Sequence, residues 1–483
     1  MASSSSSSDT TPGKLESATL SEKVFDHNLV DWDGDNDPEH PRNWSTRDKW
    51  ANIGNISILA LITNMAPTMC APGVAEIAAD LHIKSTVVST LAITLYLMGI
   101  SIVRSTEGSR SITELTFIFV VFIIGGALSK TTAQYMVFRF LSGCAGGTPM
   151  ALGGGSIADL TTSQERATAM ALFSLGPLAG PVLGPVIGGF VAAGKGWRWT
   201  FWLLAILGGS FGIASLVLLR ETHPKILLSR KTDRIRTMTG NPDLQSKLDS
   251  TLSPRQVVLQ VLVRPLMLLV QSPILLVISL YVALVFGVMY LLFTTFTGVF
   301  EGQYGFSMAI SGLTYLGLGV ALLFSMLIFN MFNARVLASR MKADRVQQPR
   351  PEYRLLFMIW FSPFVAFGLL LYGWTSYYQI HWIVPIVGTF MIGFGAYFVI
   401  MPAQLYLVDV FGSEAAASAL GANNLLRYIS SIFLPLAGPS MYKTLDYGWG
   451  NSLLGFLALA FLPGPILLYK YGERLRAYTK VAF

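Results

Sequence analysis

Two arginines lie inside runs of apolar residues that are long enough to cross a lipid bilayer. Arg139 stands in VFRFLSGCAGG, and Arg427 stands in ALGANNLLRYISS. A guanidinium in hydrocarbon is costly unless it faces a partner or a polar cavity, so each arginine is a candidate functional residue. Either side chain could instead be structural, with its N–H groups bonded to backbone carbonyls. Asn423 and Asn424, close to Arg427, could line a polar path or bond between helices.

The other residue types that perform chemistry form no recognisable catalytic or metal-binding set. The five histidines are scattered outside the apolar runs. Cys70 and Cys144 lie within such runs, which predicts neither a disulfide framework nor a metal cluster. The sequence also lacks a phosphate-binding loop and a Ser-His-Asp set. It therefore disfavours a membrane-embedded enzyme or a non-transporting receptor, and we expect no cofactor.

The apolar runs indicate the architecture. Of 483 residues, 52% are hydrophobic and only 13% are charged, too few for the surface of a soluble domain of this size. A bilayer core of about 30 Å needs about 20 apolar residues per helix. We predict an all-α integral membrane protein with twelve transmembrane helices in two six-helix halves. The predicted spans are 50–69, 87–103, 112–129, 135–158, 167–193, 200–219, 273–296, 308–329, 355–372, 382–404, 415–441 and 453–469.

Lysine and arginine are concentrated in the segments that an even number of spans would place on one side of the membrane. The positive-inside rule assigns that side to the cytosol, with both termini there. The membrane topology therefore explains the net charge of +7, and we expect no nucleic-acid partner. The predicted segments are a disordered cytosolic N-terminal tail (1–49), the first half (50–219), a cytosolic linker (220–272), the second half (273–470) and a cytosolic C-tail (471–483).

Two six-helix halves joined by a linker are typical of duplicated transporters, whose site lies near the membrane midplane between the halves. Each half carries one intramembrane arginine. Each also carries one aspartate at the cytosolic end of a span that contains glycine or proline, Asp159 in the first half and Asp409 in the second.

The stretch SLGPLAGPVLGPVIGGF, residues 174–190, carries helix-breaking residues inside a predicted span. Gly176, Gly180, Gly184 and Gly188 follow one stripe, because four residues turn about 400° around a helix. A stripe without side chains lets another helix approach closely. Each proline removes a backbone hydrogen bond and bends the helix. We predict a kinked helix that packs closely against the neighbouring half.

These residues also resemble a known family. Gly180-x-x-x-Gly184-Pro185-x-x-Gly188-Gly189 matches the antiporter motif of the major facilitator superfamily, which marks its drug:proton antiporter branch. The resemblance covers nearly the whole chain and implies a twelve-span efflux transporter. Further segments that resemble fungal members of this branch are DPEHPRNWS (37–45), VFRFLSGCAGG (137–147), GGGSIADL (153–160), QERATAMALFSLGP (164–177), GWRWTFW (196–202) and YGWGNSLLGF (447–456).

The resemblance implies a role for the first intramembrane arginine. Arg139 with Gly143 is similar to the family's Arg-x-x-x-Gly motif of helix 4, which implies a part in proton transfer or in positioning the proton-binding group. Arg427 has weaker family support. No carboxylate inside the first two spans offers itself as the proton carrier, so coupling to the proton gradient is implied by the resemblance alone.

The resemblance also implies a cytosolic lock. Asp159 and Arg166 bracket the turn between spans four and five, where an acidic residue of the family pairs with the loop between helices 2 and 3. Asp409 and Glu414 resemble the counterpart in the second half. The chain departs from the family in that loop, because MGISIVRSTEGSRSITEL (98–115) keeps little of Gly-x-x-x-Asp-Arg-x-Gly-Arg-Arg/Lys. Divergence or a faulty gene model could explain the difference, and it puts the lock in doubt.

Aromatic residues of spans seven and ten could line an amphiphilic cavity for flat organic substrates, although the aromatic content favours lipid contact or core packing for any one of them. They are Tyr281, Tyr290, Phe293, Phe296, Tyr397, Phe398 and Tyr406. The expected function is export of small organic compounds, such as drugs, toxins or secondary metabolites, across the plasma membrane by a monomer that uses the proton gradient. Two alternatives stay open: an importer of the same fold, and a divergent member that no longer transports.

Overall fold

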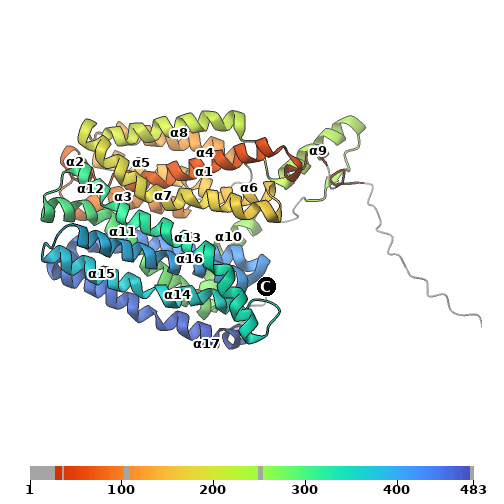
Figure 1. Ribbon diagram of the computed structural model, residues 1–483. Coiled ribbons are helices and arrows are strands. Elements are labelled where there is room, and N and C mark those ends of the chain that lie inside the picture. Colours follow the sequence, from red (N-terminus) through yellow and green to blue (C-terminus); the bar gives the residue numbers. More distant parts are fainter. Residues whose placement is uncertain (1–27, 35–36, 103–108, 249–253, 479–483) are drawn as a thin grey trace, which may run out of the picture.

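The computed structural model describes residues 28–34, 37–102, 109–248 and 254–478. Its helices form two tiers with their axes running in a common direction, the first half above and the second half below (Figure 1). Among the described residues, seven helical segments are long and apolar enough to span a membrane, and the bent pair of α1 (Thr46–Met69) and α2 (Val74–Asp80) makes an eighth. Shorter apolar helices at Thr86–Ser101 and Ser111–Ala127 pack beside them. The chain is a multi-pass membrane protein.

Six helical rods build the first half. The fourth rod is broken at Gly147, one residue before Thr148 and Pro149 begin a new helix, so the predicted span 135–158 is two helices. The long helix of the fifth rod begins with a capping box, in which Thr162 and Glu165 satisfy each other's backbone N–H groups. The remaining helices of this half are α3 (Thr86–Ile102), α4 (Ser109–Ala127), α5 (Thr132–Gly146), α6 (Thr148–Leu160), α7 (Ser163–Lys195) and α8 (Arg198–Leu218).

Six further rods build the second half. The continuous helix α16 (Ile383–Phe461) supplies three of them, because the backbone turns sharply at Gly412 (φ 64°) and Asp446 (φ 55°). Glycine suits the first turn, since a positive φ is strained for residues with a Cβ. The other elements of this half are α11 (Pro273–Tyr304), α12 (Met308–Leu313), α13 (Tyr315–Asp344), η2 (Pro351–Arg354), α14 (Leu355–Phe361), α15 (Pro363–Tyr377) and α17 (Pro463–Tyr478).

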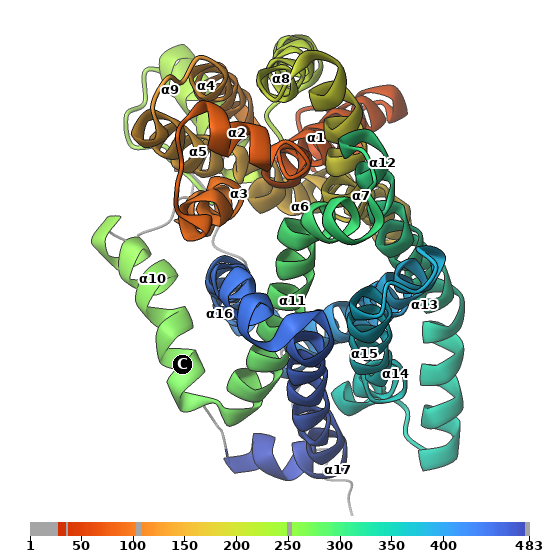
Figure 2. The same ribbon diagram turned by 90° about the vertical axis from the view of Figure 1, so that its left-hand side faces the viewer.

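The linker and both terminal segments lie at one end of the bundle, which we call the linker end (Figure 1). Helix α9 (Pro224–Thr239) projects beyond the spanning helices, whereas α10 (Pro254–Gln271) lies across the second half, as the view along the bundle shows (Figure 2). Helix α10 contacts α11 and α16.

The described part of the predicted N-terminal tail is folded, so the expectation of disorder is wrong for residues 28–34 and 37–49. Strand β1 (Leu29–Val30) pairs in parallel with β2 (Gln245–Ser246) of the linker. The short helix η1 (Pro41–Asn43) follows, and α1 begins at Thr46, four residues before the predicted span. We call residues 28–34 and 37–43, together with the linker surface they cover, the N-terminal clasp.

Charge pairs hold the N-terminal clasp on α9. The Lys231 ammonium lies 2.9 Å from a carboxylate oxygen of Asp33 and 2.8 Å from one of Asp37. Burial alone would raise the pKa of Asp37, but hydrogen bonds from Lys231 and from two backbone N–H groups lower that pKa to about 2. Asp37 is therefore ionised at neutral pH, and the pair is complete.

Candidate functional site

Arg139 of α5 is fully buried and donates to five acceptors on two neighbouring helices. Its Nε donates to the carbonyl oxygen of Ala92 at 2.8 Å, and Nη1 donates to that of Ala66 at 3.0 Å. Its Nη2 donates to the carbonyls of Pro67 (3.2 Å) and Ile93 (3.3 Å) and to the sulfur of Cys70 (3.4 Å). The guanidinium thus ties α1 and α3 to α5 through backbone oxygens.

Two of these acceptors, the carbonyls of Ala66 and Pro67, are available because α1 ends beside Arg139. The last carbonyls of a helix have no later N–H to bond, and the helix dipole places partial negative charge there, which suits a guanidinium. Pro67 also lacks an N–H, so the carbonyl of Thr63 loses its helical donor, and the Tyr96 hydroxyl donates to it at 2.9 Å instead. This tyrosine was not predicted as part of the site.

Glycine lets α5 approach α3 closely enough for Arg139 to reach across. A Cβ placed at Gly143 would lie 2.1 Å from the carbonyl oxygen of Tyr96, and one at Gly99 would lie 2.3 Å from that of Phe140. Substitution at either position requires backbone movement. The close approach at Gly143 and the hydrogen bonds of Arg139 therefore hold α5 against the same helix, α3. This arrangement is the one expected if Arg139 has a structural role.

Arg427, on the segment of α16 between Gly412 and Asp446, has a different environment. It is 7% exposed, and among the described residues its Nη2 donates to the Tyr428 hydroxyl alone, at 3.4 Å. Its guanidinium carbon lies 4.6 Å from the ring centroid of Phe286 and 5.1 Å from that of Tyr428. Phe286 was not predicted as a neighbour. Arg427 is thus surrounded by aromatic faces rather than by carbonyl oxygens.

The two asparagines near Arg427 differ from each other. Asn423 is fully buried, and neither its amide oxygen nor its amide nitrogen has a hydrogen-bond partner. It precedes Arg427 by four residues and so occupies the same face of the helix. Asn424 points to a partly exposed position on another side. The structure therefore groups Asn423 with Arg427 and separates Asn424 from them.

The glycine stripe of α7 packs within its own half, which corrects the prediction that it faces the other half. A Cβ at Gly176, Gly180, Gly184 or Gly188 would meet α1 at 2.0 to 2.9 Å, the shortest distance being from Gly188 to the carbonyl oxygen of Met69. Helix spacing predicts a close approach but does not say which helix approaches.

A second face of α7 makes the contact with the other half. A Cβ at Gly189 would lie 2.9 Å from the carbonyl oxygen of Met308, and one at Gly312 would lie 2.7 Å from that of Pro185. Farther along, Gly319 of α13 packs against the Val182 side chain. Gly189 and Pro185 of the antiporter motif thus lie at the boundary between the halves, where α7 meets α12 and α13.

The residues predicted for a lock lie at the linker end, but the structure does not join them across the halves. Arg166 donates to the carbonyl of Ala158 at 3.2 Å, and within the described ranges it forms no ion pair with the half-buried Asp159. Asp409 pairs with Arg354 at 2.9 Å inside the second half. The Glu414 side chain and residues 103–108, which include most of the divergent loop, lie outside the described residues.

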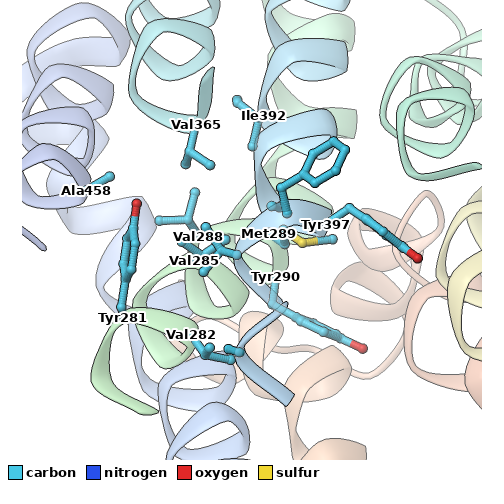
Figure 3. Close-up of a cluster of buried hydrophobic side chains, with 14 of the residues drawn as sticks. Tyr281, Val282, Val285, Val288, Met289, Tyr290, Val365, Ile392, Tyr397 and Ala458 are labelled. Carbon is cyan, nitrogen blue, oxygen red and sulfur yellow. The ribbon is translucent and has the colours of Figure 1, made fainter. Parts of the chain in front are cut away.

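The predicted aromatic residues fall into two groups. Tyr281, Phe293, Phe296, Phe398 and Tyr406 are at most 1% exposed and pack in the core of the second half. Tyr290 and Tyr397 belong to the same cluster, but their phenol groups extend together toward the orange ribbons of the first half, whereas Tyr281 lies on the other side of the cluster, near Ala458 (Figure 3). Of the predicted aromatic residues labelled there, Tyr290 and Tyr397 are the ones directed toward the first half.

Comparison with known proteins assigns this architecture. Residues 56–435 match the profile of the Major Facilitator Superfamily. The chain is 49% identical over 462 residues to the MFS transporter prlG of a fungal species (strain NRRL 50135), covering 92% of this chain and 96% of that protein. The chain belongs to the Major Facilitator Superfamily. It is a membrane transporter of this superfamily rather than an enzyme.

A second relative carries a functional name. The chain is 42% identical over 469 residues to the efflux pump radE of Floropilus chiversii, covering 95% of this chain and 87% of that protein. Among solved structures, a D-xylose-proton symporter matches with a TM-score of 0.65 and 16% identity, covering 86% of this chain and 98% of that one. This superfamily fold, with twelve helices in two halves, was predicted from the apolar runs and the antiporter motif.

Proposed function

We propose that this superfamily member exports small organic compounds, such as drugs, toxins or secondary metabolites, from a fungal cell. The observation that carries the proposal is the similarity over nearly the full chain to a relative named as an efflux pump. The intact antiporter motif on α7 agrees with export. The molecule works as a monomer in the plasma membrane, with the linker end in the cytosol.

Alternating access is the mechanism that the geometry favours. The glycine stripe joins α7 to α1, so α7 moves with the first half, while Gly189 and Pro185 meet α12 at the boundary between halves. Side chains such as Leu97 and Val182 pack across the boundary elsewhere, but the contact of α7 with α12 is made largely by glycine and backbone, and one half can rock against the other there around a central site. We propose that proton antiport drives the cycle, with the proton gradient as the energy source.

The test is efflux from cells that express the full chain, compared with cells that do not. The cells are loaded with a broad panel of fluorescent hydrophobic compounds, and retained fluorescence is followed with and without a protonophore. We expect lower retention in expressing cells and loss of that difference when the proton gradient collapses. Equal retention of every compound would contradict export. Efflux that persists after the gradient collapses would contradict proton antiport but would leave the proposal of export intact.

A further inference from the structure

The polar groups around Arg427 are incomplete in a way that points to a ligand. Within the described ranges of the chain, Arg427 Nε has no hydrogen-bond partner, and neither amide atom of Asn423 has one. Both residues are buried. Buried polar groups in proteins are nearly always hydrogen-bonded, because an unpaired one costs the desolvation free energy that a partner would return. These three atoms lie one helical turn apart. They offer a ligand two donors, Arg427 Nε and Asn423 Nδ2, and one acceptor, Asn423 Oδ1.

The charge of this set is also uncompensated. Within the part of the chain that the structure describes, no carboxylate forms an ion pair with Arg427, although such pairs are present at the linker end. Arg139 shows how this fold satisfies a structural arginine, by surrounding it with backbone oxygens. Among the described residues, Arg427 has one hydroxyl at 3.4 Å and two aromatic rings around it. An anion would complete this environment.

The aromatic rings around Arg427 indicate what kind of molecule would carry this anion. Phe286 and Tyr290 of α11 have ring centroids 5.2 Å apart, and Phe286 meets Tyr428 edge-on at 6.4 Å. Leu97 and Val182 of the first half pack in the same buried cluster as Tyr290. Tyr290 and Tyr397 extend toward that half (Figure 3). The rings thus lie where the two halves meet, and their faces suit a flat apolar body.

We propose that Arg427 and Asn423 form the recognition site for an organic anion, a carboxylate attached to a flat apolar body. This inference rests on the proposed function, because it names the substrate class of the same transporter. The planar guanidinium donates to the acidic oxygens of the substrate in a charge-assisted pair. The Asn423 amide bonds a neighbouring carbonyl or hydroxyl, and the rings around Phe286 contact the apolar body.

The test measures binding separately from transport. The purified full chain in detergent is titrated calorimetrically with a panel of matched pairs, each an amphipathic aromatic or polycyclic carboxylic acid and its methyl ester. The ester keeps the apolar body and removes the charge. We expect at least one acid to bind about 10- to 100-fold more tightly than its ester, the effect of a charge-assisted hydrogen bond. If every ester binds as tightly as its acid, the inference is overturned.

Three variants assign the selectivity to Arg427. Arg427→Gln should weaken the acid to the affinity of the ester and leave the ester unchanged, which also shows that the variant is folded. Arg427→Lys should keep part of the preference, because the charge stays but the planar fork is lost. Arg335→Gln is the matched control, because Arg335 is an exposed arginine over the Phe332 ring at 5.9 Å. Wild-type selectivity in Arg427→Gln would overturn the inference.

The two proposals can fail separately. Selective binding of acids by the purified chain, together with unchanged retention in expressing cells, would support the anion site and contradict export. Efflux of neutral compounds from cells, with equal affinities for acids and esters, would support export and overturn the anion site.

Discussion

Replacing Arg139 with alanine tests whether this arginine is part of the scaffold. The side chain donates to the carbonyls of Ala66 and Pro67, in the last turn of α1. It also donates to those of Ala92 and Ile93 on α3. The substitution removes all of these bonds at once and leaves a cavity among three helices. We expect Arg139→Ala to lower the thermal stability of the first half.

The expected size of this effect follows from the carbonyls at the end of α1. No later helical N–H can replace Arg139 there, and each buried acceptor left unpaired costs about 1–3 kcal/mol, so two cost about 2–6 kcal/mol. A domain of 150–250 residues loses about 2–4 °C of Tm per kcal/mol, which predicts a fall of about 4–24 °C. Arg139→Lys keeps the charge but offers fewer donors in a different geometry, so its Tm should lie between that of the wild type and that of Arg139→Ala.

The assay is thermal unfolding of the purified chain in detergent, followed by the loss of the monodisperse peak in size-exclusion chromatography. Arg427→Ala is the matched control, because it removes the other intramembrane guanidinium. Removing a buried cation without an anion costs little and can stabilise a protein, so the Tm of this variant should stay at or above that of the wild type.

Two outcomes would refute this reasoning. A wild-type Tm for Arg139→Ala, combined with lost transport, would show that Arg139 acts in proton transfer rather than in the scaffold. Equal falls in Tm for Arg139→Ala and Arg427→Ala would show that the backbone carbonyls around Arg139 do not distinguish the two sites.

Two further substitutions test the packing of α7 and the N-terminal clasp. Gly188→Ala should lower Tm by several degrees in the same assay, because its Cβ would lie 2.0 Å from a backbone oxygen of Met69, whereas Gly194→Ala, with open space around it, should not. Equal Tm values for these variants would contradict the contact with α1. Asp37→Asn should speed hydrogen exchange in α9 at neutral pH, relative to intrinsic rates. Since folding lowers the pKa of Asp37 from 3.8 to about 2, wild-type protection from this pair is complete above about pH 4 and is lost between pH 4 and 2; unchanged protection over that range would contradict the ion pair.

The membrane architecture was predictable because hydrocarbon imposes a strong rule on the chain. Every span must satisfy its own backbone, so apolar length alone predicts helices. The breaks within the spans were harder to predict. Gly147 caps α5 inside the predicted span 135–158, yet as a glycine shortly before a proline it resembles Gly180, which stays inside α7 in close contact with α1. The turn at Gly412, by contrast, falls between the predicted spans 382–404 and 415–441.

The environments of the two arginines could not be predicted, because they depend on neighbours distant in the chain. Arg139 and Arg427 have similar sequence surroundings, each being a lone cation in an apolar run. The difference arises from the end of α1 beside Arg139 and from the ring of Phe286 beside Arg427. Both contacts bridge more than 70 residues of sequence, so only the folded chain distinguishes the sites.

The N-terminal clasp was missed although the sequence contains a signal for it. The segment DWDGDNDPEH before the first span is acidic, and SRKTDRIR in the linker is basic. Opposite charges in two segments predicted to lie on the same side of a membrane favour pairing, as Lys231 does with Asp33 and Asp37. Because the chain begins with a Ser-rich segment, we extended the predicted disorder as far as residue 49, past the acidic segment.

The boundary between α7 and α12 has a consequence for how such transporters diversify. Gly189 and Gly312 meet there through backbone atoms, so the contact carries little information about which side chains stand elsewhere in either half. Side chains near this contact can therefore change in one half without a matching change in the other. This freedom is confined to the contact, because Leu97 and Val182 of the first half pack in the core of the second half and must change together with it.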